Sequence, residues 1–385
     1  MHGTNSVKTQ STEGIKLHPI TDAIEDIAQG KMVIVVDDED RENEGDFVLA
    51  AEKATPEHIN FMSIHGRGLH CVPLPESRCD ELKLHPMVGN NTDPKGTAFT
   101  VSVDLLGHGV TTGISASDRA KTIQAIMDEE TTPEQLGRPG HIFPLRAKKG
   151  GVLRRPGHTE AAVDLSILAG LKPGGVIVEI MNDDGTMARL PQLVKIAEKH
   201  DLKLISIQDL IAYRLQNESL ITRMDSFTVN THYGSFEMIA YKQTTNGQIH
   251  FVLKLGDWGK NEAVPVRVKS TNTYYDLFNA LLKGENPQLQ RVVDILQQKG
   301  KGAIVFINNI SNNEIVLEKL RNFKELASGS GANPLPPDQK DYGIGAQIIH
   351  DLGISKLHLI TQQPNVKRNL SGYGLEIESY IKLAD

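Results

Sequence analysis

Residues 32–51, MVIVVDDEDRENEGDFVLAA, decide the fold of the first half of the chain. The segments Met32–Val36 and Phe47–Ala51 are apolar and typical of buried strands. Between them, seven of the ten residues from Asp37 to Asp46 are acidic. A block of like charges normally indicates a solvated segment. Because this block is flanked by two core elements, it is predicted to form a rigid turn between two strands.

The clustering of these acids also bears on function. Neighbouring carboxylates raise one another's pKa unless a cation, an arginine or a shared proton relieves the repulsion. The turn therefore suggests a divalent metal site, an acid–base pair, or both. A polar hairpin loop facing water is the alternative interpretation, since charged loops are common.

Length and composition limit the class of protein. A chain of 385 residues predicts two domains, and its net charge of -7 gives no general affinity for nucleic acid or acidic membranes. The polar N-terminus and the absence of an apolar run near the length of about 20 residues that spans a bilayer predict a soluble, cytoplasmic protein. Cys71 and Cys79 are the only cysteines, so a metal would be held mainly by oxygen and imidazole.

Two further segments place polar residues next to regular structure. A helix is predicted over Ile20–Ala28, ending at Gly30. The Gly/Thr-rich passage 107–119 leads into a second helical pattern, with Ser117 or Asp118 as the N-cap. The free N–H groups of such a helix start can cradle a phosphate. An ordinary capped helix is the alternative.

A third polar segment carries Arg155 and His158 at the start of another predicted helix. Arg155 can bind an anion, and His158 can be a metal ligand or proton carrier, or merely an exposed histidine. In the predicted strand Val176–Met181, Glu179 stands alone among apolar residues. It either has a partner or a task in the interior, or it points to solvent. His141 lies in a further loop with rigid, apolar neighbours.

Together these segments resemble 3,4-dihydroxy-2-butanone 4-phosphate synthase over roughly residues 20–214. The strings that carry the resemblance are DDEDRENEGD (37–46), TTGISA (111–116), RPGHIFPL (138–145), RPGHTEA (155–161) and NDDG (182–185) after Glu179. The resemblance implies conversion of ribulose 5-phosphate, a phosphosugar, into 3,4-dihydroxy-2-butanone 4-phosphate and formate in riboflavin biosynthesis. It also implies a homodimer.

The resemblance also implies roles for individual residues. Glu42 and His158 match the family's magnesium ligands, and manganese is expected to substitute because imidazole is an unusual partner for magnesium. No zinc is expected. The residues matched to substrate binding are Arg41, Glu42, Asp46, Thr112, Arg155, Pro156, Gly157, His158, Thr159 and Glu179. Those matched to catalysis are His141, Glu179, Asp46, Glu44 and Cys71, with proton roles only loosely assigned.

From about Tyr213 the chain is similar to GTP cyclohydrolase II, with matches at DYGIGAQI (341–348), DLG (351–353) and GYGLE (372–376). That family needs zinc held by three cysteines to activate water. The three positions hold Asn272, Lys283 and Glu285 here, and other active-site positions have also changed. These are NISNNEI (309–315) in place of QEGRGIG, Lys340 in place of an arginine, and Val366 in place of a lysine, while Asp338, Thr361 and Pro364 persist.

The predicted fold is therefore α/β (α+β), with a synthase domain over residues 1–212 and a cyclohydrolase-like α/β domain over 213–385 that is catalytically inactive. The junction near residues 211–219 has no Pro or Gly break and is predicted to be helical. The partner predictions are a small-molecule substrate and a second copy of the chain, without nucleic acid or membrane. Two alternatives remain for the second domain: a regulatory module that binds a nucleotide or flavin, or a second catalytic activity on GTP.

Overall fold

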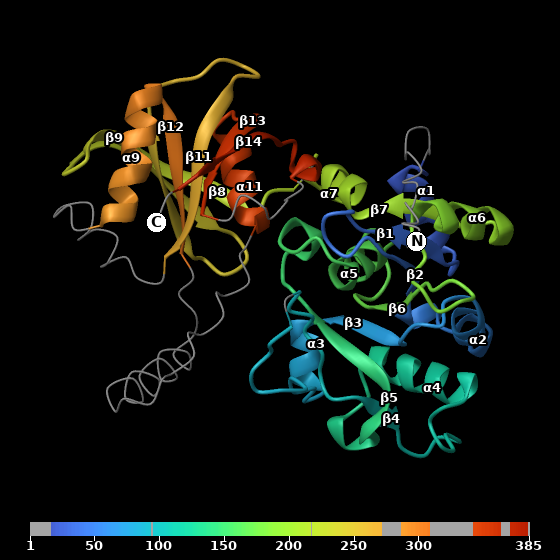
Figure 1. Cartoon of the computed structure of the whole chain (residues 1–385). Helices are drawn as coiled ribbons and strands as arrows, with labels where there is room; N and C mark the ends of the chain where they lie inside the picture. Colours follow the sequence, from blue (N-terminus) through green and yellow to red (C-terminus); the bar gives the residue numbers. More distant parts are fainter. Residues whose placement is uncertain are drawn as a thin grey trace, which may run out of the picture. The chain divides into compact units, whose positions relative to one another are not determined.

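The chain forms two compact units, each built on a seven-stranded sheet (Figure 1). The computed structural model describes residues 17–93, 95–216, 218–271, 286–308, 342–362 and 370–383. The first unit comprises the described residues up to Gly89, together with Ala98–Ala147 and Gly157–Leu210. The second comprises the described residues of 90–97, 148–156 and 211–385. Both units mix helices and strands, which confirms the predicted fold class.

The first sheet has the strand order β4-β5-β3-β6-β2-β1-β7. Its strands are β1 (Val33–Val36), β2 (Gly45–Ala50), β3 (Cys71–Pro75), β4 (Val103–Leu105), β5 (Leu136–Ala147), β6 (Gly175–Glu179) and β7 (Lys203–Ser206). The helices are α1 (Ile20–Ala28), α2 (Pro56–His65), α3 (Glu76–Glu81), α4 (Ala116–Met127), α5 (His158–Leu168), α6 (Leu190–His200) and α7 (Ile207–Leu215), with short turns η1 (Ala51–Lys53) and η2 (Pro133–Gln135). Strand β2 pairs antiparallel with both β1 and β6.

Both faces of this sheet are buried under helices. Successive side chains of a strand point to opposite faces, so Phe47 and Leu49 face one side and Val48 the other. Phe47 and Leu49 share a core with buried side chains of α2, α4 and α6. The opposite face is covered by α5, which packs against β2, β3 and β6. Because Asp46 alternates with Phe47, its side chain points to the α5 side.

The sequence predicted the elements around the acidic turn well. Helix α1 spans Ile20–Ala28, and β1 and β2 flank the turn. The predicted N-cap of α4, Ser117 or Asp118, is wrong. Ser115 has the extended backbone of an N-cap, and its hydroxyl accepts a hydrogen bond from the N–H of Asp118 at 3.0 Å. The carboxylate of Asp118 has other partners.

The second sheet has the order β14-β13-β11-β12-β10-β9-β8. Its strands are β8 (Ile221–Thr231), β9 (Gly234–Gln243), β10 (Ile249–Leu255), β11 (Ala263–Thr271), β12 (Gly302–Asn308), β13 (Lys356–Thr361) and β14 (Glu376–Lys382). The remaining elements are α9 (Pro287–Lys299), α11 (Tyr342–Asp351), η3 (Gly151–Leu153) and η4 (Ser371–Tyr373). Strands β11 to β14 pair in parallel, and β8 to β10 in antiparallel fashion.

The junction between the two halves is helical as far as Leu215, the last residue of α7, and β8 begins at Ile221. Most positions that distinguish the second half from GTP cyclohydrolase II lie outside the described residues: Asn272, Lys283, Glu285, 309–315, Asp338, Lys340, Pro364 and Val366. Thr361 is described, and it lies buried at the end of β13. Among the described helices, none combines the length and the apolar character needed to cross a membrane.

Candidate active site

The acidic turn between β1 and β2 is organised by its first residue, Asp37. One carboxylate oxygen of Asp37 accepts hydrogen bonds from Nη1 of Arg41 at 2.8 Å and from the backbone N–H of Glu42 at 3.1 Å. The other accepts from the N–H of Glu44 at 2.9 Å. Arg41 Nη1 also donates to Glu42 Oε2 at 2.6 Å. The turn is therefore closed by a buried carboxylate, and its conformation is fixed as the sequence predicted.

Sheet pairing brings three predicted residues to the α5 side of the sheet. In the β2–β6 register Asp46 lies opposite Glu179, so their side chains share a face. Cys71 lies opposite Ile177, two residues before Glu179, and therefore shares that face too. Burial, with the charges of Glu179 and Asp46, raises the pKa of the Cys71 thiol.

Asp46 is a buried carboxyl group with one unsatisfied oxygen among the described residues. Its residue is 3% exposed, and its Oδ1 has no hydrogen-bond partner among the described residues. Burial, and then the charges of Glu179 and Asp37, raise its pKa well above the ordinary value. Burial and Glu42 also raise the pKa of Glu44. An unpaired buried carboxylate is costly, so Asp46 is suited to carry a proton or to face a cation.

The Glu179 side chain is held by the backbone just before β3. Its Oε2 accepts a hydrogen bond from the N–H of Leu69 at 2.8 Å. Gly68 lies directly against it, because an added Cβ there would come within 2.7 Å of the Glu179 backbone nitrogen. Glu179 therefore has a fixed partner and does not simply point to solvent.

His158, the first residue of α5, is buried beneath the turn. Its Nε2 lies 3.0 Å from the carbonyl oxygen of Val35 and donates to it, which leaves the lone pair on Nδ1. Nδ1 lies 4.0 Å from Oδ2 of Asp46. Burial lowers the pKa of His158, so the ring is neutral. A neutral imidazole with a fixed tautomer is the form that binds a metal.

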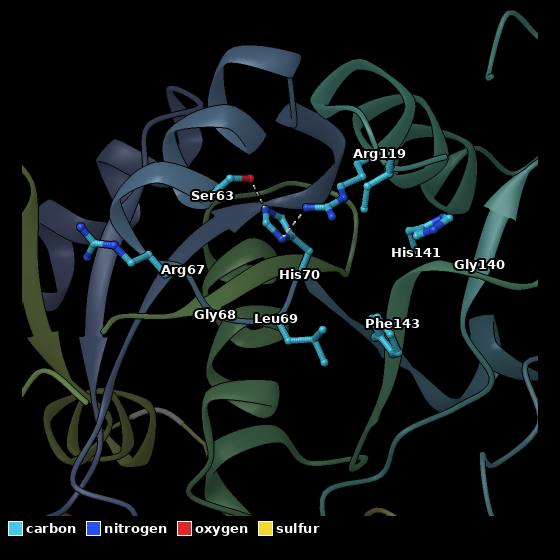
Figure 2. Close-up of a pocket in the computed structure, with 10 residues that line it drawn as sticks. Ser63, Arg67, Gly68, Leu69, His70, Arg119, Gly140, His141 and Phe143 are labelled. Atoms are coloured by element: carbon cyan, nitrogen blue, oxygen red, sulfur yellow. Dashed lines mark hydrogen bonds between the residues drawn. The ribbon is translucent and has the colours of Figure 1, made fainter. Parts of the chain in front are cut away.

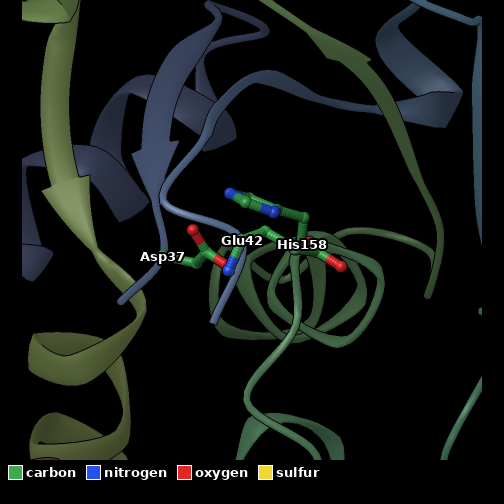
Figure 3. Close-up of side chains that lie close together, drawn as sticks. All are labelled: Asp37, Glu42 and His158. Carbon is green, nitrogen blue, oxygen red and sulfur yellow. The ribbon is translucent and has the colours of Figure 1, made fainter. Parts of the chain in front are cut away.

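Asp37, Glu42 and His158 form a group that could hold a cation (Figure 3). One ligand atom from each lies within 4.8 Å of the others. The expected ligands Glu42 and His158 are thus brought together, and Asp37 joins them. Sequence reasoning had not singled out Asp37 among seven similar acids, although its position directly after the strand is a signal. Two carboxylates, one imidazole and the unpartnered Asp46 oxygen nearby fit a divalent cation.

His141 belongs to a second polar group, on β5. Its Nδ1 lies 2.7 Å from Oδ2 of Asp104, and its backbone N–H donates to Oδ1 at 2.9 Å. Asp104 comes from the three-residue strand β4, and sequence reasoning missed it because so short a strand has no readable periodicity. The pair fixes the ring with Nδ1–H donated to the carboxylate, so Nε2 is left to accept a proton.

The predicted phosphate cradle around Thr112 is occupied by a side chain of the same segment. Oδ2 of Asp118 accepts hydrogen bonds from the N–H and hydroxyl of Thr111, at 3.2 and 2.8 Å, and from the N–H of Gly113 at 3.2 Å. Thr112 itself is exposed on this loop. The capped-helix interpretation therefore fits the segment better than a cradle of free N–H groups.

The segment Arg155–Thr159 leads into α5 and includes its first two residues. Gly157 is the N-cap of this helix, and Thr159 is buried in its first turn. Arg155 donates to the carbonyl oxygen of Lys95 at 3.3 Å, and Arg155 and Pro156 belong to the second unit. Substrate binding by this segment remains a prediction, as do the individual roles of the other matched residues.

Comparison with known proteins matches each half of the chain to a family. The family model of 3,4-dihydroxy-2-butanone 4-phosphate synthase matches residues 21–213, and that of GTP cyclohydrolase II matches residues 222–382. The chain is similar to the riboflavin biosynthesis protein RibBA of Cytophaga hutchinsonii, with 55% identity over 377 residues, 96% of this chain and 93% of that protein. It is 49% identical over 373 residues to RibBA of Aquifex aeolicus, covering 95% and 92% of the two chains.

Solved structures agree. The crystal structure of RibBX from A. baumannii, described as a two domain 3,4-dihydroxy-2-butanone 4-phosphate synthase, covers 96% of this chain and 100% of its own, with 38% identity and a TM-score of 0.63. A 3,4-dihydroxy-2-butanone 4-phosphate synthase in complex with two magnesium ions matches 52% of this chain and 98% of its own, with 43% identity and a TM-score of 0.50.

The chain belongs to the 3,4-dihydroxy-2-butanone 4-phosphate synthase family. It is an enzyme of riboflavin biosynthesis with synthase activity, followed by a domain of the GTP cyclohydrolase II type. The resemblance stated from the sequence is thereby confirmed.

Proposed function

We propose that the first domain converts D-ribulose 5-phosphate into 3,4-dihydroxy-2-butanone 4-phosphate and formate, with magnesium held by Glu42 and His158. The observation that carries the proposal is the group formed by Asp37, Glu42 and His158 beside the buried Asp46. The two products together contain all the atoms of the substrate, so the reaction needs proton transfers but no external oxidant. Manganese is expected to substitute for magnesium.

The residues of the chain suit the required proton transfers. A bound divalent cation supplies Lewis-acid stabilisation of negative charge on substrate oxygens. Burial and the charge of Glu179 raise the pKa of Asp46, which suits it to holding a proton, while Glu179 is fixed by the Leu69 N–H. His141 presents Nε2 because Asp104 holds Nδ1. These groups provide acid and base functions on fixed elements.

The test is formate release by the purified full-length protein from ribulose 5-phosphate with magnesium. Formate production should vanish with EDTA and in Glu42→Ala, and in His158→Asn it should require a higher magnesium concentration. Glu39→Gln is the matched control, because Glu39 is an exposed acid of the same turn and should leave the rate unchanged. Absence of formate from the wild type with both magnesium and manganese would refute the proposal.

The second domain is proposed to lack GTP cyclohydrolase II activity. Zinc activation of water in that family needs three cysteine thiolates, whereas both cysteines of this chain, Cys71 and Cys79, lie in the first half. The A. baumannii relative of 96% coverage is described as a two domain synthase, which favours a structural or regulatory second domain here. Relatives carrying the name RibBA keep bifunctional catalysis as the competing function.

Two measurements on the full chain separate these functions. Formate release from GTP in the presence of zinc, without ribulose 5-phosphate, would overturn the proposal of an inactive domain. A rise in melting temperature that grows with the concentration of GTP or a flavin would instead identify a regulatory ligand, because binding to the folded state stabilises it. The remaining expectations, a homodimer located in the cytoplasm, belong to the same proposal, and sedimentation of the purified protein tests the dimer.

A further inference from the structure

Arg119, in the first turn of α4, is a half-buried cation that none of the mechanistic roles above uses. It lines a cavity of about 360 Å³ in the first unit, together with Arg67, His70 and His141 (Figure 2). Its Nε is buried without a hydrogen-bond partner among the described residues. Burial lowers the pKa of Arg119, and the charge of Asp104 only partly opposes this effect.

Asp104, the carboxylate whose charge acts on Arg119, is already engaged. Both carboxylate oxygens of Asp104 accept hydrogen bonds from His141, at 2.9 and 2.7 Å. Within the described part of the chain, no carboxylate lies within salt-bridge distance of the Arg119 guanidinium. A planar guanidinium has five donors arranged to bind an oxyanion through two of them. The arginine is therefore charged, partly desolvated and short of acceptors.

A neutral histidine holds Arg119 in place. Nη1 of Arg119 donates to Nδ1 of His70 at 3.1 Å (Figure 2). Nε2 of His70 lies 3.3 Å from the Ser63 hydroxyl and 3.4 Å from the carbonyl oxygen of Ile59, so the ring proton is on Nε2. Because His70 accepts without carrying a negative charge, it orients the guanidinium and leaves its positive charge available.

The other arginine of the cavity provides a contrast. Arg67 forms an ion pair with Asp183 and donates to the carbonyl oxygen of Met181 at 2.8 Å. Arg67 thus already has an anionic partner within the protein. Two arginines therefore line the same cavity, and they differ in that Arg67 has a carboxylate partner whereas Arg119 has a neutral histidine.

We propose that Arg119 binds a small oxyanion in this cavity, either the phosphate group of the substrate or the released formate, and that His70 positions Arg119 for this purpose. The proposal rests on the proposed function for the origin of these two anions. Both present oxygens that match the guanidinium fork, and both occur in the same reaction. The ligand class is a small oxyanion, and the experiment distinguishes its two sources.

The test measures binding of inorganic phosphate and of sodium formate separately by calorimetry, with the full chain and at ionic strength held constant with sodium chloride. Arg119→Gln should weaken binding of one of the two anions by about tenfold or more, the usual effect of losing a hydrogen bond to a charged group. Arg119→Lys, which keeps the charge but not the fork, should lie between. Arg67→Gln is the matched control and should change neither affinity appreciably.

The pattern of losses identifies the anion. Loss of phosphate binding in Arg119→Gln, with a raised KM for ribulose 5-phosphate and a smaller change in kcat, assigns the substrate phosphate. Loss of formate binding, with weaker product inhibition and an unchanged KM, assigns the product. If phosphate binding is lost only in Arg155→Gln, and Arg119→Gln binds both anions like the wild type, the proposal is overturned.

The positioning role of His70 has its own readout. His70→Gln retains an acceptor and should preserve anion binding, whereas His70→Leu should weaken it as Arg119→Gln does. Equal binding by the two His70 variants would remove this part of the proposal. Because calorimetry does not need turnover, an inactive wild type that binds the anions through Arg119 would contradict the proposed function and leave the anion site intact. Should Arg119→Gln fail to fold, Arg119→Lys and the His70 pair still decide the question.

Discussion

Replacing Asp37 by asparagine should destabilise the first domain although it removes one charge from an acidic cluster. The Asp37 side chain is 1% exposed and its partner Arg41 is 18% exposed. Three hydrogen bonds end on its two oxygens, from Arg41 and from the backbone N–H groups of Glu42 and Glu44. Asparagine keeps one oxygen, and its NH₂ group would face a donor.

The size of this destabilisation follows from costs and gains that oppose one another. Removing one partner of a buried ion pair costs about 3–5 kcal/mol. Relief of like-charge repulsion offsets part of this cost, because the charge of Asp37 contributes to the raised pKa of both Asp46 and Glu44. Arg41 also keeps its ion pair with Glu42 and is still partly exposed, and both lower the penalty for removing Asp37. One backbone N–H, of Glu42 or Glu44, would face the new amide group, which adds about 1 kcal/mol or more. The expected net loss in the free energy of unfolding is about 2–3 kcal/mol.

Hydrogen exchange of the β1 and β2 amides in the full-length protein measures this loss locally, because the exchange rates report the free energy of opening of that region. Glu39→Gln removes the same charge from an exposed position of the turn and should change the opening free energy by about 0.5 kcal/mol or less. Saturating magnesium should stabilise the wild type more than Asp37→Asn. Equal stability of Asp37→Asn and Glu39→Gln would refute the idea that Asp37 organises the turn.

Three further predictions concern the rest of the first domain. Gly140→Ala should lower the free energy of unfolding by about 1–3 kcal/mol and reduce activity, because an added Cβ would collide with the backbone of β4. Gly89→Ala is the control: its Cβ would lie in open space, and the variant should melt like the wild type. Burial and a neighbouring arginine lower the pKa of His70 from 6.5 to about 4. Between pH 6.5 and 4 the unfolded chain therefore binds a proton that the folded chain does not. The free energy of unfolding should fall by up to about 3 kcal/mol as the pH drops through this range. Thermal melts of His70→Gln should lack this part of the pH dependence. Cys71 and Cys79 are buried and burial raises the pKa of both thiols, so iodoacetamide at pH 8 should leave the native protein unmodified, and rapid labelling would contradict the buried placement.

Local patterns were enough to predict the elements that carry the acidic turn. Two apolar runs around a charged block indicate strands, because the apolar runs are buried in the core and the charged residues between them form the turn. The boundaries of α1 and the flanks of the turn followed from such patterns. The N-cap of α4 did not, because Ser115, Ser117 and Asp118 are all good caps, and the choice depends on the partners of Asp118 in the preceding loop.

The site could be predicted only in part because its geometry depends on strand order. The sequence identified Asp46 and Glu179 separately, but only the pairing of β2 with β6 places them opposite one another. Asp104 was missed because its effect on His141 arises between β4 and β5. Asp37 was missed for a different reason: seven acids look alike in sequence, and the buried one differs only in its contacts.

The acidic turn is better suited to binding a cation than to stabilising the fold. Arg41 is shared between Asp37 and Glu42, so it faces two carboxylates, while Oδ1 of the buried Asp46 has no hydrogen-bond partner in the described part of the chain. A turn selected for stability alone would place apolar or neutral groups at such buried positions, since replacing buried ion pairs by packed apolar groups is often neutral or stabilising. The fixed neutral tautomer of His158 adds a ligand where a second positive charge would have served stability better. This arrangement supports the proposed divalent cation, which Glu42 and His158 would hold and which would offset the negative charge of the turn.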